Sequence, residues 1–181
     1  MSTRISVQHE AAGLQIGVAV SRYHAFSTDP LLAGAIDRFL RLGGRDDDLL
    51  IVPAAGTWEL GALALALARR AEIDAVVALG TVIQGETPHF TYICQGITRM
   101  LSDVTSHTGK PVGYGILTCE TAAQAEARSG GEVGNKGAEA MQAAIETACA
   151  IRSLQQIVGR GGEGAGEGAG RGGGDRSAAG G

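Results

Sequence analysis

The chain has 181 residues, of which 44% are hydrophobic, and a formal net charge of −4, so it is long enough for one domain, or two small ones, with a proper core. No basic cluster is present, which argues against nucleic acid as the main partner, and no apolar run approaches the roughly 18 residues that span a membrane. The N-terminus lacks the pattern of a secretion signal, and three cysteines without metal-ligand spacing indicate reduced thiols in a cytoplasmic protein.

The first half of the chain alternates apolar runs with helical patterns. Residues 14–20 and 48–53 are predicted strands, because each is a short and nearly continuous apolar run. Residues 29–42 and 57–71 are predicted helices, because their apolar residues recur at a spacing of three and four. Residues 5–8 are a further candidate, as an edge strand.

The second half repeats the pattern. Residues 75–80 and 111–117 are predicted strands, and residues 90–108, 121–128 and 136–156 are predicted helices. Strand followed by helix, repeated, predicts right-handed βαβ units on a parallel sheet. The continuous apolar runs are typical of parallel strands that are buried on both faces. The sequence therefore predicts an α/β fold.

The last segment of the chain, residues 159–181, differs in composition from everything before it. It holds 12 of the 29 glycines and no large apolar side chain. Such a segment cannot bury enough apolar surface to offset the entropy of ordering it. We therefore expect a folded domain over residues 1–158 and a Gly-rich, disordered tail over residues 159–181.

Unusual side chains gather where the predicted strands end, which is where open parallel sheets bind their ligands. The segments that follow the strands are residues 21–26, 54–59, 80–90 and 118–121. Aromatic residues make up only 4% of the chain, yet Tyr23, Trp58 and Phe90 all lie in these segments. They either stack on a planar ligand or simply seal the edge of the sheet.

One of these segments, GTVIQGETPHF at residues 80–90, combines polar groups in a turn. A turn through Gly85 exposes backbone N–H groups beside Thr87, an arrangement that can bind phosphate, although it is neither a P-loop nor a dinucleotide fingerprint. His89 is either a general acid or base, since its unperturbed pKa lies near neutrality, or a solvated loop histidine. No histidine pair has metal-ligand spacing, so no metal site is predicted.

A second polar stretch, residues 126–140, opens the last long helix with Asn135, Lys136 and Gly137. A helix N-terminus near Arg128 and Lys136 favours an anion. The alternative is an ordinary junction with surface cations, which is favoured for this stretch taken alone.

Taken together, these segments resemble the lumazine synthase family over residues 16–154. The motifs that carry the resemblance are AAGTWEL (54–60), GTVIQGETPHF (80–90), KPVGYGILT (110–118) and QAEARSGGEVGNKGAEA (124–140). The resemblance implies a flavodoxin-like three-layer α/β/α sandwich with a central parallel sheet, in agreement with the pattern of strands and helices.

The resemblance also implies a reaction, that of a transferase of riboflavin biosynthesis. The family condenses 5-amino-6-(D-ribitylamino)uracil with 3,4-dihydroxy-2-butanone 4-phosphate and releases 6,7-dimethyl-8-ribityllumazine, phosphate and water. No metal or organic cofactor is implied. Imine formation, loss of phosphate and ring closure each move a proton, which a near-neutral imidazole can accept and return.

Roles for individual residues follow from the same resemblance. His89 matches the proton-transfer residue, Glu139 an acidic residue that orients or polarises it, and Lys136 a group near both substrates. The residues that match substrate contacts are Tyr23, Trp58, Glu59, Val82, Ile83, Gly85, Glu86, Thr87, Tyr114 and Arg128. Among these, residues 85–87 and Arg128 match the phosphate contacts. Tyr114, Arg128 and Lys136 match residues supplied by the neighbouring subunit.

The chain departs from the usual family pattern at a few positions. This chain has Tyr23-His24 where the family usually has Phe-Asn. It also has Gly61 in place of Pro, Gln84 in place of Arg and Tyr114 in place of Phe. A tyrosine at residue 23 still stacks, and His24 either reaches the site or faces solvent. The loss of a cation at residue 84 leaves more of the anion binding to Arg128, and the hydroxyl of Tyr114 needs a partner.

A site built from two subunits implies a homopentamer, which in many family members closes with eleven others into an icosahedral shell. The short form of the loop before Asn135 favours the shell. Riboflavin synthase, which related shells enclose, is a candidate partner of the tail. The favoured alternative is that the tail is a disordered extension without a partner. The alternative function is a catalytically weak shell or scaffold that binds flavin or lumazine.

Overall fold

A parallel sheet forms the centre of the protein, whose computed structural model describes residues 2, 4–6 and 8–163. Within these residues the sheet has four strands in the order β2-β1-β3-β4, and each neighbouring pair is parallel. The strands are β1 (Ile16–Ser21), β2 (Leu49–Ala54), β3 (Ala75–Ile83) and β4 (Val112–Cys119).

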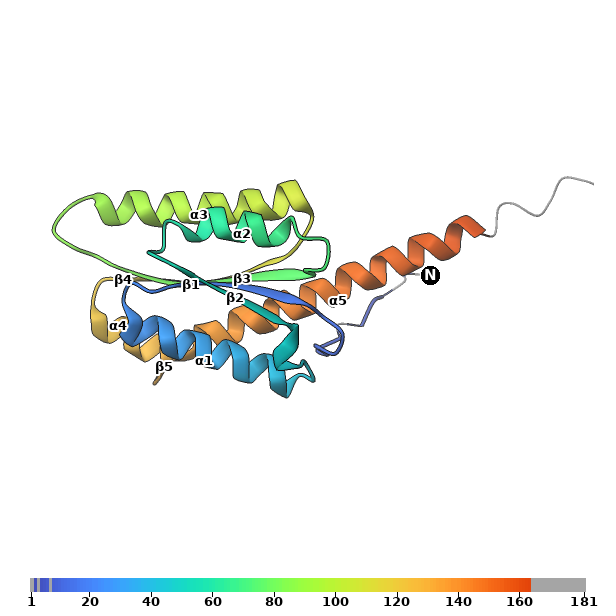
Figure 1. Cartoon of the computed structure of the whole chain (residues 1–181), viewed down its shortest axis with the longest axis horizontal. Helices are drawn as coiled ribbons and strands as arrows, with labels where there is room; N and C mark the ends of the chain where they lie inside the picture. Colours follow the sequence, from blue (N-terminus) through green and yellow to red (C-terminus); the bar gives the residue numbers. More distant parts are fainter. Residues whose placement is uncertain (1, 3, 7, 164–181) are drawn as a thin grey trace, which may run out of the picture.

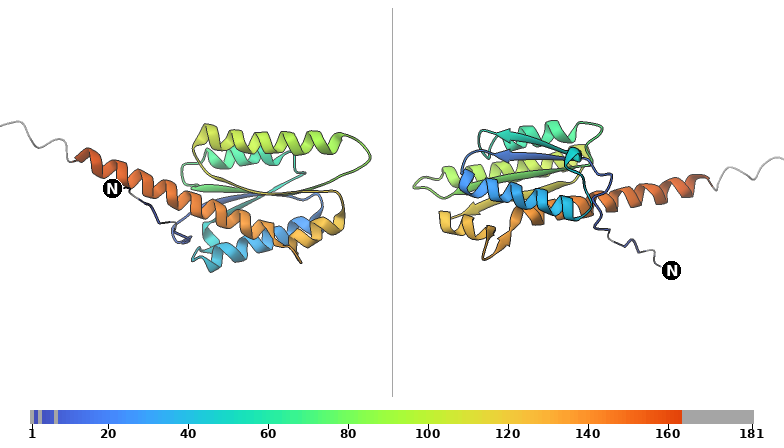
Figure 2. Two further views of the ribbon diagram at one scale, coloured as in Figure 1. Left: turned by 180° about the vertical axis from the view of Figure 1, so that it is seen from behind. Right: turned by 60° about the horizontal axis from the view of Figure 1, so that its bottom comes forward.

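Helices cover both faces of this sheet, which makes the fold a flavodoxin-like three-layer α/β/α sandwich (Figure 1). The helices are α1 (Ala25–Arg41), α2 (Leu60–Ala68), α3 (His89–Thr108), α4 (Ala122–Arg128) and α5 (Lys136–Glu163). Helices α2 and α3 lie on one face, and α1, α4 and α5 on the other (Figures 1 and 2). The end of α5 extends past the sheet (Figure 1).

The two faces of the sheet bury separate hydrophobic clusters. In β3, Val77 and Leu79 pack toward α1 and α5, and Val76 and Ala78 pack toward α2 and α3. This alternation follows from the period of two in a strand, and a strand buried on both faces reads as a continuous apolar run. The largest helix side chains in the two clusters are Leu31, Phe39, Met141 and Ile145 on one face and Leu60, Leu67, Ile97 and Leu101 on the other.

The order of the strands creates a crevice at the carboxyl end of the sheet. The chain leaves β1 through α1 for the edge strand β2, and then returns through α2 to β3 on the other side of β1. Ligands of open parallel sheets bind at such a reversal of strand order, between connections that run to opposite faces. The topology therefore directs attention to the ends of β1, β2 and β3.

The sequence placed the main elements in the right order but not all their ends. Helix α1 begins at Ala25, four residues before the predicted start, and β3 continues past Gly80 to Ile83. The predicted edge strand at residues 5–8 is wrong, because Ile5, Ser6 and Gln8 belong to no strand. Residues 129–135, predicted as a loop, form a short antiparallel pair, β5 (Ser129–Gly131) with β6 (Gly134–Asn135).

Helix α5 continues to Glu163, so its last residues overlap the tail expected from residue 159. Residues 164–181 of that tail lie outside the described residues. Within the described residues, no helix is both long and apolar enough to cross a membrane.

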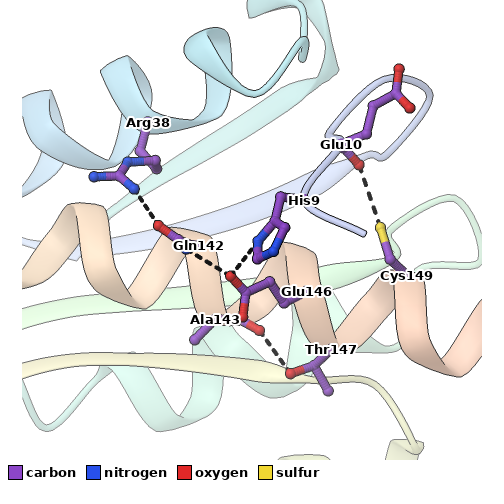
Figure 3. Close-up of polar contacts among 8 residues, drawn as sticks. All are labelled: His9, Glu10, Arg38, Gln142, Ala143, Glu146, Thr147 and Cys149. Atoms are coloured by element: carbon purple, nitrogen blue, oxygen red, sulfur yellow. Dashed lines mark hydrogen bonds and ion pairs between the residues drawn. The ribbon is translucent and has the colours of Figure 1, made fainter. Parts of the chain in front are cut away.

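The segment before β1 is fastened to α5 by side-chain contacts (Figure 3). His9 Nδ1 lies 2.7 Å from Glu146 Oε1, which also accepts a bond of 2.7 Å from Gln142 Nε2. Arg38 of α1 in turn donates to Gln142 (Figure 3). Since these side chains come from the N-terminal segment, α5 and α1, the cluster links three parts of the chain.

Candidate functional site

A pocket of about 510 Å³ lies at the carboxyl ends of β1, β2 and β3, as the topology predicts. It brings together many of the residues predicted for the site: Tyr23, Trp58, Glu59, Val82, Ile83, Gly85, Thr87 and His89. These residues come from three separate connections of the fold. The sequence therefore identified most of one pocket from segments that are far apart in the chain.

The aromatic rim of the pocket is held from behind. The Trp58 side chain remains 48% exposed, and it lies against Gly96 of α3, where an added Cβ atom would overlap the indole. Tyr23, which follows β1, is 66% exposed. Large apolar rings left open at the mouth of a pocket favour a planar ligand that would cover them.

Buried hydroxyl groups connect the three segments behind this rim. Ser27 Oγ of α1 and Thr81 Oγ1 of β3 lie 2.9 Å apart. Thr57 Oγ1, in the turn before α2, donates to the carbonyl of Thr81 at 3.2 Å. All three side chains are buried, where a hydrogen bond is expensive to lose. This network fixes the relative positions of the connections that line the pocket.

The polar turn of residues 84–89 forms one side of the pocket and is exposed throughout. Its first residue, Gln84, donates its backbone N–H to the carbonyl of Cys119 at 2.9 Å. Gly85 has open space where a side chain would be, so a ligand can approach the backbone closely. His89 is the first residue of α3 and borders the pocket together with Thr87.

His24, for which the sequence left two alternatives, lines the same pocket. Its ring packs edge-on against Tyr23, with the ring centroids 4.4 Å apart. Burial lowers the pKa of its imidazole below the ordinary value, because a low-dielectric environment disfavours the charged form. His24 thus reaches the site as a predominantly neutral side chain at neutral pH.

Other predicted residues gather in a second pocket of about 410 Å³, between β4 and the start of α5. Tyr114, Lys136 and Glu139 line it. Lys136 Nζ donates to both carboxylate oxygens of Glu139, at 2.9 and 2.8 Å. Within one chain, therefore, Glu139 pairs with Lys136 and does not share a pocket with His89.

Glu86 and Arg128 border neither of these two pockets. Glu86 is exposed in the polar turn, and Arg128 is half-buried at the end of α4, where its guanidinium donates to the carbonyl of Gln124 at 3.1 Å. Arg128 also affects Cys119: burial raises the pKa of that thiol, and the guanidinium opposes the shift. The sequence had grouped Arg128 with the phosphate-binding turn, and a single chain does not bring them into one pocket.

The start of α5 is capped by the chain itself. Asn135 Oδ1 accepts the backbone N–H groups of Gly137 at 2.9 Å and Ala138 at 3.0 Å, as an N-cap residue does. Its amide nitrogen donates to the carbonyl of Pro30 at 2.8 Å. These bonds use N–H groups that an anion at the helix N-terminus would need, so within one chain the N–H groups of Gly137 and Ala138 are not available to an anion.

Several residues of the pocket escaped the sequence reasoning: Gly56, Thr57, Thr81 and Ile93 line it as well. A signal was available for Thr81, because a hydroxyl at the end of a continuous apolar strand requires a buried partner. Gly96 carried no signal, since its contact with Trp58 depends on how α2 and α3 pack. Among the described residues, no cluster of three or more His, Cys, Asp or Glu side chains is arranged to hold a metal ion.

Comparison with known proteins identifies the family of this chain. Residues 13–152 match the family model described as 6,7-dimethyl-8-ribityllumazine synthase. A protein of that name from Aquifex aeolicus is 42% identical over 145 residues, which cover 80% of this chain and 94% of the relative. Proteins of the same name from two other organisms are also similar to this chain. The one from Porphyromonas gingivalis is 44% identical over 135 residues, which cover 75% of this chain and 84% of the relative. The one from Thermus thermophilus is 43% identical over 147 residues, which cover 81% of this chain and 92% of the relative.

Proposed function

We propose, from the premise that the chain belongs to the 6,7-dimethyl-8-ribityllumazine synthase family, that it is a transferase of riboflavin biosynthesis working in the pocket described above. Its substrates are 5-amino-6-(D-ribitylamino)uracil and 3,4-dihydroxy-2-butanone 4-phosphate, and its product is 6,7-dimethyl-8-ribityllumazine. The observation that carries the proposal is the composition of that pocket. An aromatic rim for a planar ring and a polar turn for a phosphate border one cavity of about 510 Å³, which suits two small substrates side by side.

The aromatic end of the pocket is assigned to the uracil. Tyr23 and Trp58 offer ring faces, and Glu59 beside Trp58 offers a carboxylate that accepts hydrogen bonds from N–H or hydroxyl groups. Val82 and Ile83 form an apolar wall at the end of β3. This arrangement fits a flat heterocycle that carries a polyol chain.

The polar turn is assigned to the butanone phosphate. Gly85 leaves the backbone open, and Thr87 adds a hydroxyl group. Backbone N–H groups and a hydroxyl are suitable donors to phosphate. Glu86 is exposed in the same turn. We assign its backbone N–H, and not its carboxylate, to phosphate binding.

His89 is assigned the proton transfers. It stands at the junction of the polar turn and α3, beside the pocket. The uracil amine loses protons as the imine forms, and the departing groups gain them, so one imidazole can serve in both directions. Much of the acceleration then comes from holding two reactants in register.

We assign Tyr114, Arg128, Lys136 and Glu139 to the site of a neighbouring copy in a homopentamer. Within one chain the polar turn is exposed and none of these four side chains lines the pocket, so the residues that border the pocket include no lysine or arginine for its phosphate. A copy that presents Arg128 and Lys136 would supply positive charge, and Arg suits phosphate geometry. In this arrangement, Glu139 orients or polarises His89 across the subunit boundary.

We also propose a larger assembly and a compartment. The short loop before Asn135 favours a shell of twelve pentamers, with riboflavin synthase as an enclosed partner. We place the protein in the cytoplasm because all three of its cysteines are free thiols, as in reducing compartments.

The test is to mix the full chain with both substrates and follow lumazine formation by absorbance and fluorescence, while sedimentation velocity reports the assembly. Sustained formation of 6,7-dimethyl-8-ribityllumazine by an assembled species is the expected result. Tight riboflavin binding by an assembled protein without turnover would overturn the proposal in favour of a flavin-binding shell.

A further inference from the structure

His24 lines the pocket, and the proposed function leaves it without a role. It has φ 63° and ψ 47°, and among the described residues it is the only one other than glycine with a positive φ. This left-handed conformation is unfavourable for residues with a Cβ atom, although His tolerates it better than most. Residues held in such conformations concentrate at functional sites.

The backbone at His24 is held in place by its own helix. The His24 carbonyl accepts the backbone N–H groups of Ser27 at 2.9 Å and Thr28 at 3.0 Å, and the Thr28 hydroxyl at 3.4 Å. These bonds fix the backbone from which the side chain projects. The imidazole side chain makes no cap to α1, so the helix does not use its nitrogen atoms.

The ring of His24 is held by other rings. It meets Tyr23 at an interplanar angle of 60° and Phe26 at 82°, with centroids 4.4 and 5.8 Å away. Within the described residues, His24 forms hydrogen bonds only through its backbone carbonyl, and its ring nitrogens have no partner there. An imidazole that lines a pocket, packed against two other rings and with both nitrogens unused, is available to a ligand.

We propose that His24 is a specificity-determining residue that hydrogen-bonds the edge of the uracil ring in the pocket. The proposal rests on the proposed function. A planar ring lying against Tyr23 presents its edge to His24, because the two side chains are steeply inclined to each other. Uracil alternates N–H donors and carbonyl acceptors along its edge. A neutral imidazole has one donor and one acceptor, whereas the protonated form has two donors and no acceptor.

Protonation of His24 therefore removes half of this complementarity. Its lowered pKa keeps the neutral form dominant at neutral pH. The other titratable side chains of the pocket are Tyr23 beside it and Glu59 and His89 further along the lining, and Arg22 precedes it in the chain. Because His89 is a second imidazole in the same pocket, the pH dependence of His24 is measured as a difference between variants.

The experiment compares the full-length assembled protein with His24→Asn and His24→Phe. Asparagine accepts the left-handed conformation and offers a donor and an acceptor that do not titrate. Phenylalanine keeps a ring and removes both nitrogens. We expect His24→Phe to raise the KM for the uracil substrate about tenfold, with the KM for butanone phosphate within about twofold of the unmodified protein, and His24→Asn to recover most of that loss.

The pH readout separates recognition from a structural role. Direct binding of 6,7-dimethyl-8-ribityllumazine, followed by fluorescence, should weaken for the unmodified protein as pH falls from about 7 to 5 more than it does for His24→Asn. Parallel binding curves for the two proteins would overturn the inference, as would equal changes in both KM values. This binding readout does not need turnover. The inference about His24 can therefore fail while the proposed function stands, and the proposed function can fail while the binding result stands.

Discussion

The phenolic oxygen of Tyr114, on β4, lies 2.9 Å from the hydroxyl oxygen of Thr98, on α3. Thr98 Oγ1 also lies 2.7 Å from the carbonyl oxygen of Cys94, to which it donates. A hydroxyl has a single hydrogen, so Thr98 accepts from Tyr114 and donates to Cys94. The Tyr114 hydroxyl, which was expected to need a hydrogen-bond partner, therefore has one in Thr98. The bond holds the Tyr114 ring in one orientation although the residue is 43% exposed.

This chain of bonds predicts a coupling between the two side chains. Tyr114→Phe and Thr98→Val each remove the bond, so the double variant should be less destabilised than the sum of the single variants. Since both groups are partly exposed, we expect a coupling free energy of about 0.5–1 kcal/mol. Urea unfolding of the four proteins measures it.

A control for the valine substitution is Thr147→Val. Thr147 on α5 makes the same kind of bond to the carbonyl four residues before it, at 2.7 Å. Combined with Tyr114→Phe it should show additive effects. A coupling of zero in the Thr98 cycle, or an equal coupling in the Thr147 cycle, would contradict the assigned bond.

The contact between His9 and Glu146 (Figure 3) predicts how the N-terminal segment depends on pH. The hydrogen bond from Gln142 and the contact with His9 hold the pKa of Glu146 below its ordinary value of 4.5. A carboxyl whose pKa is depressed on folding stabilises the fold above the unfolded pKa, and this contribution is lost as pH falls through the folded pKa. Glu146→Gln should therefore lower the free energy of unfolding at pH 7 by about 1 kcal/mol or less, since the side chain is 29% exposed and screened by solvent.

The difference between Glu146→Gln and the unmodified protein should then shrink as pH falls below about 4.5. A matched control is Asp37→Asn, which removes a more exposed ion pair with Arg41 and should change the stability by less than about 0.5 kcal/mol. Thermal unfolding between about pH 7 and pH 3 measures both. A deficit of Glu146→Gln that grows as pH falls below about 4.5 would show that the sign is wrong.

Gly137 predicts where α5 cannot tolerate a side chain. A Cβ atom at this position would overlap the backbone carbonyl of Leu31 in α1, and backbone cannot move aside cheaply. Gly137→Ala should cost about 1–3 kcal/mol, as overpacking of a core does. Gly85→Ala is the comparison, because its Cβ would meet open space. Chemical denaturation measures both, and an equally mild effect at the two glycines would refute the packing argument.

The alternation of strands and helices could be predicted because both leave a direct hydrophobic pattern. The continuous run at Val76–Leu79 reflects burial of β3 on both faces. The start of α1 could not be predicted, because the pair Asp29-Pro30 is typical of a helix N-terminus. The helix begins earlier because the His24 carbonyl accepts hydrogen bonds from the backbone N–H groups of Ser27 and Thr28. Pro30 then lies inside the helix.

The site shows the same division. That Tyr23, Trp58 and His89 meet follows from the rule that parallel strands end at one edge. That Glu139 and His89 border different pockets of one chain cannot be read from spacing, since it depends on α3 and α5 covering opposite faces of the sheet (Figure 1). The β5–β6 pair was missed for another reason: it is held by backbone bonds and Asn135, with no apolar pattern.

The separation of the two pockets predicts complementation between subunits. If the site uses His89 from one copy and Lys136 from the next, His89→Ala and Lys136→Ala should each lose about 100-fold or more in kcat. Co-refolded in equal amounts, the two variants should regain activity, because some boundaries then join an intact His89 to an intact Lys136. For random mixing around a ring, roughly a quarter of the sites are complete.

The control is a mixture of Lys136→Ala with Arg128→Ala, whose substitutions fall in the same half of the proposed site. No boundary in that mixture can join a complete pair, so its activity should stay at the level of the single variants. Recovery in the first mixture alone indicates a site shared between copies. Failure of the first mixture, in assemblies verified by native mass spectrometry to contain both variants, would place Lys136 in the site of its own chain, which the position of its pocket between β4 and α5 argues against.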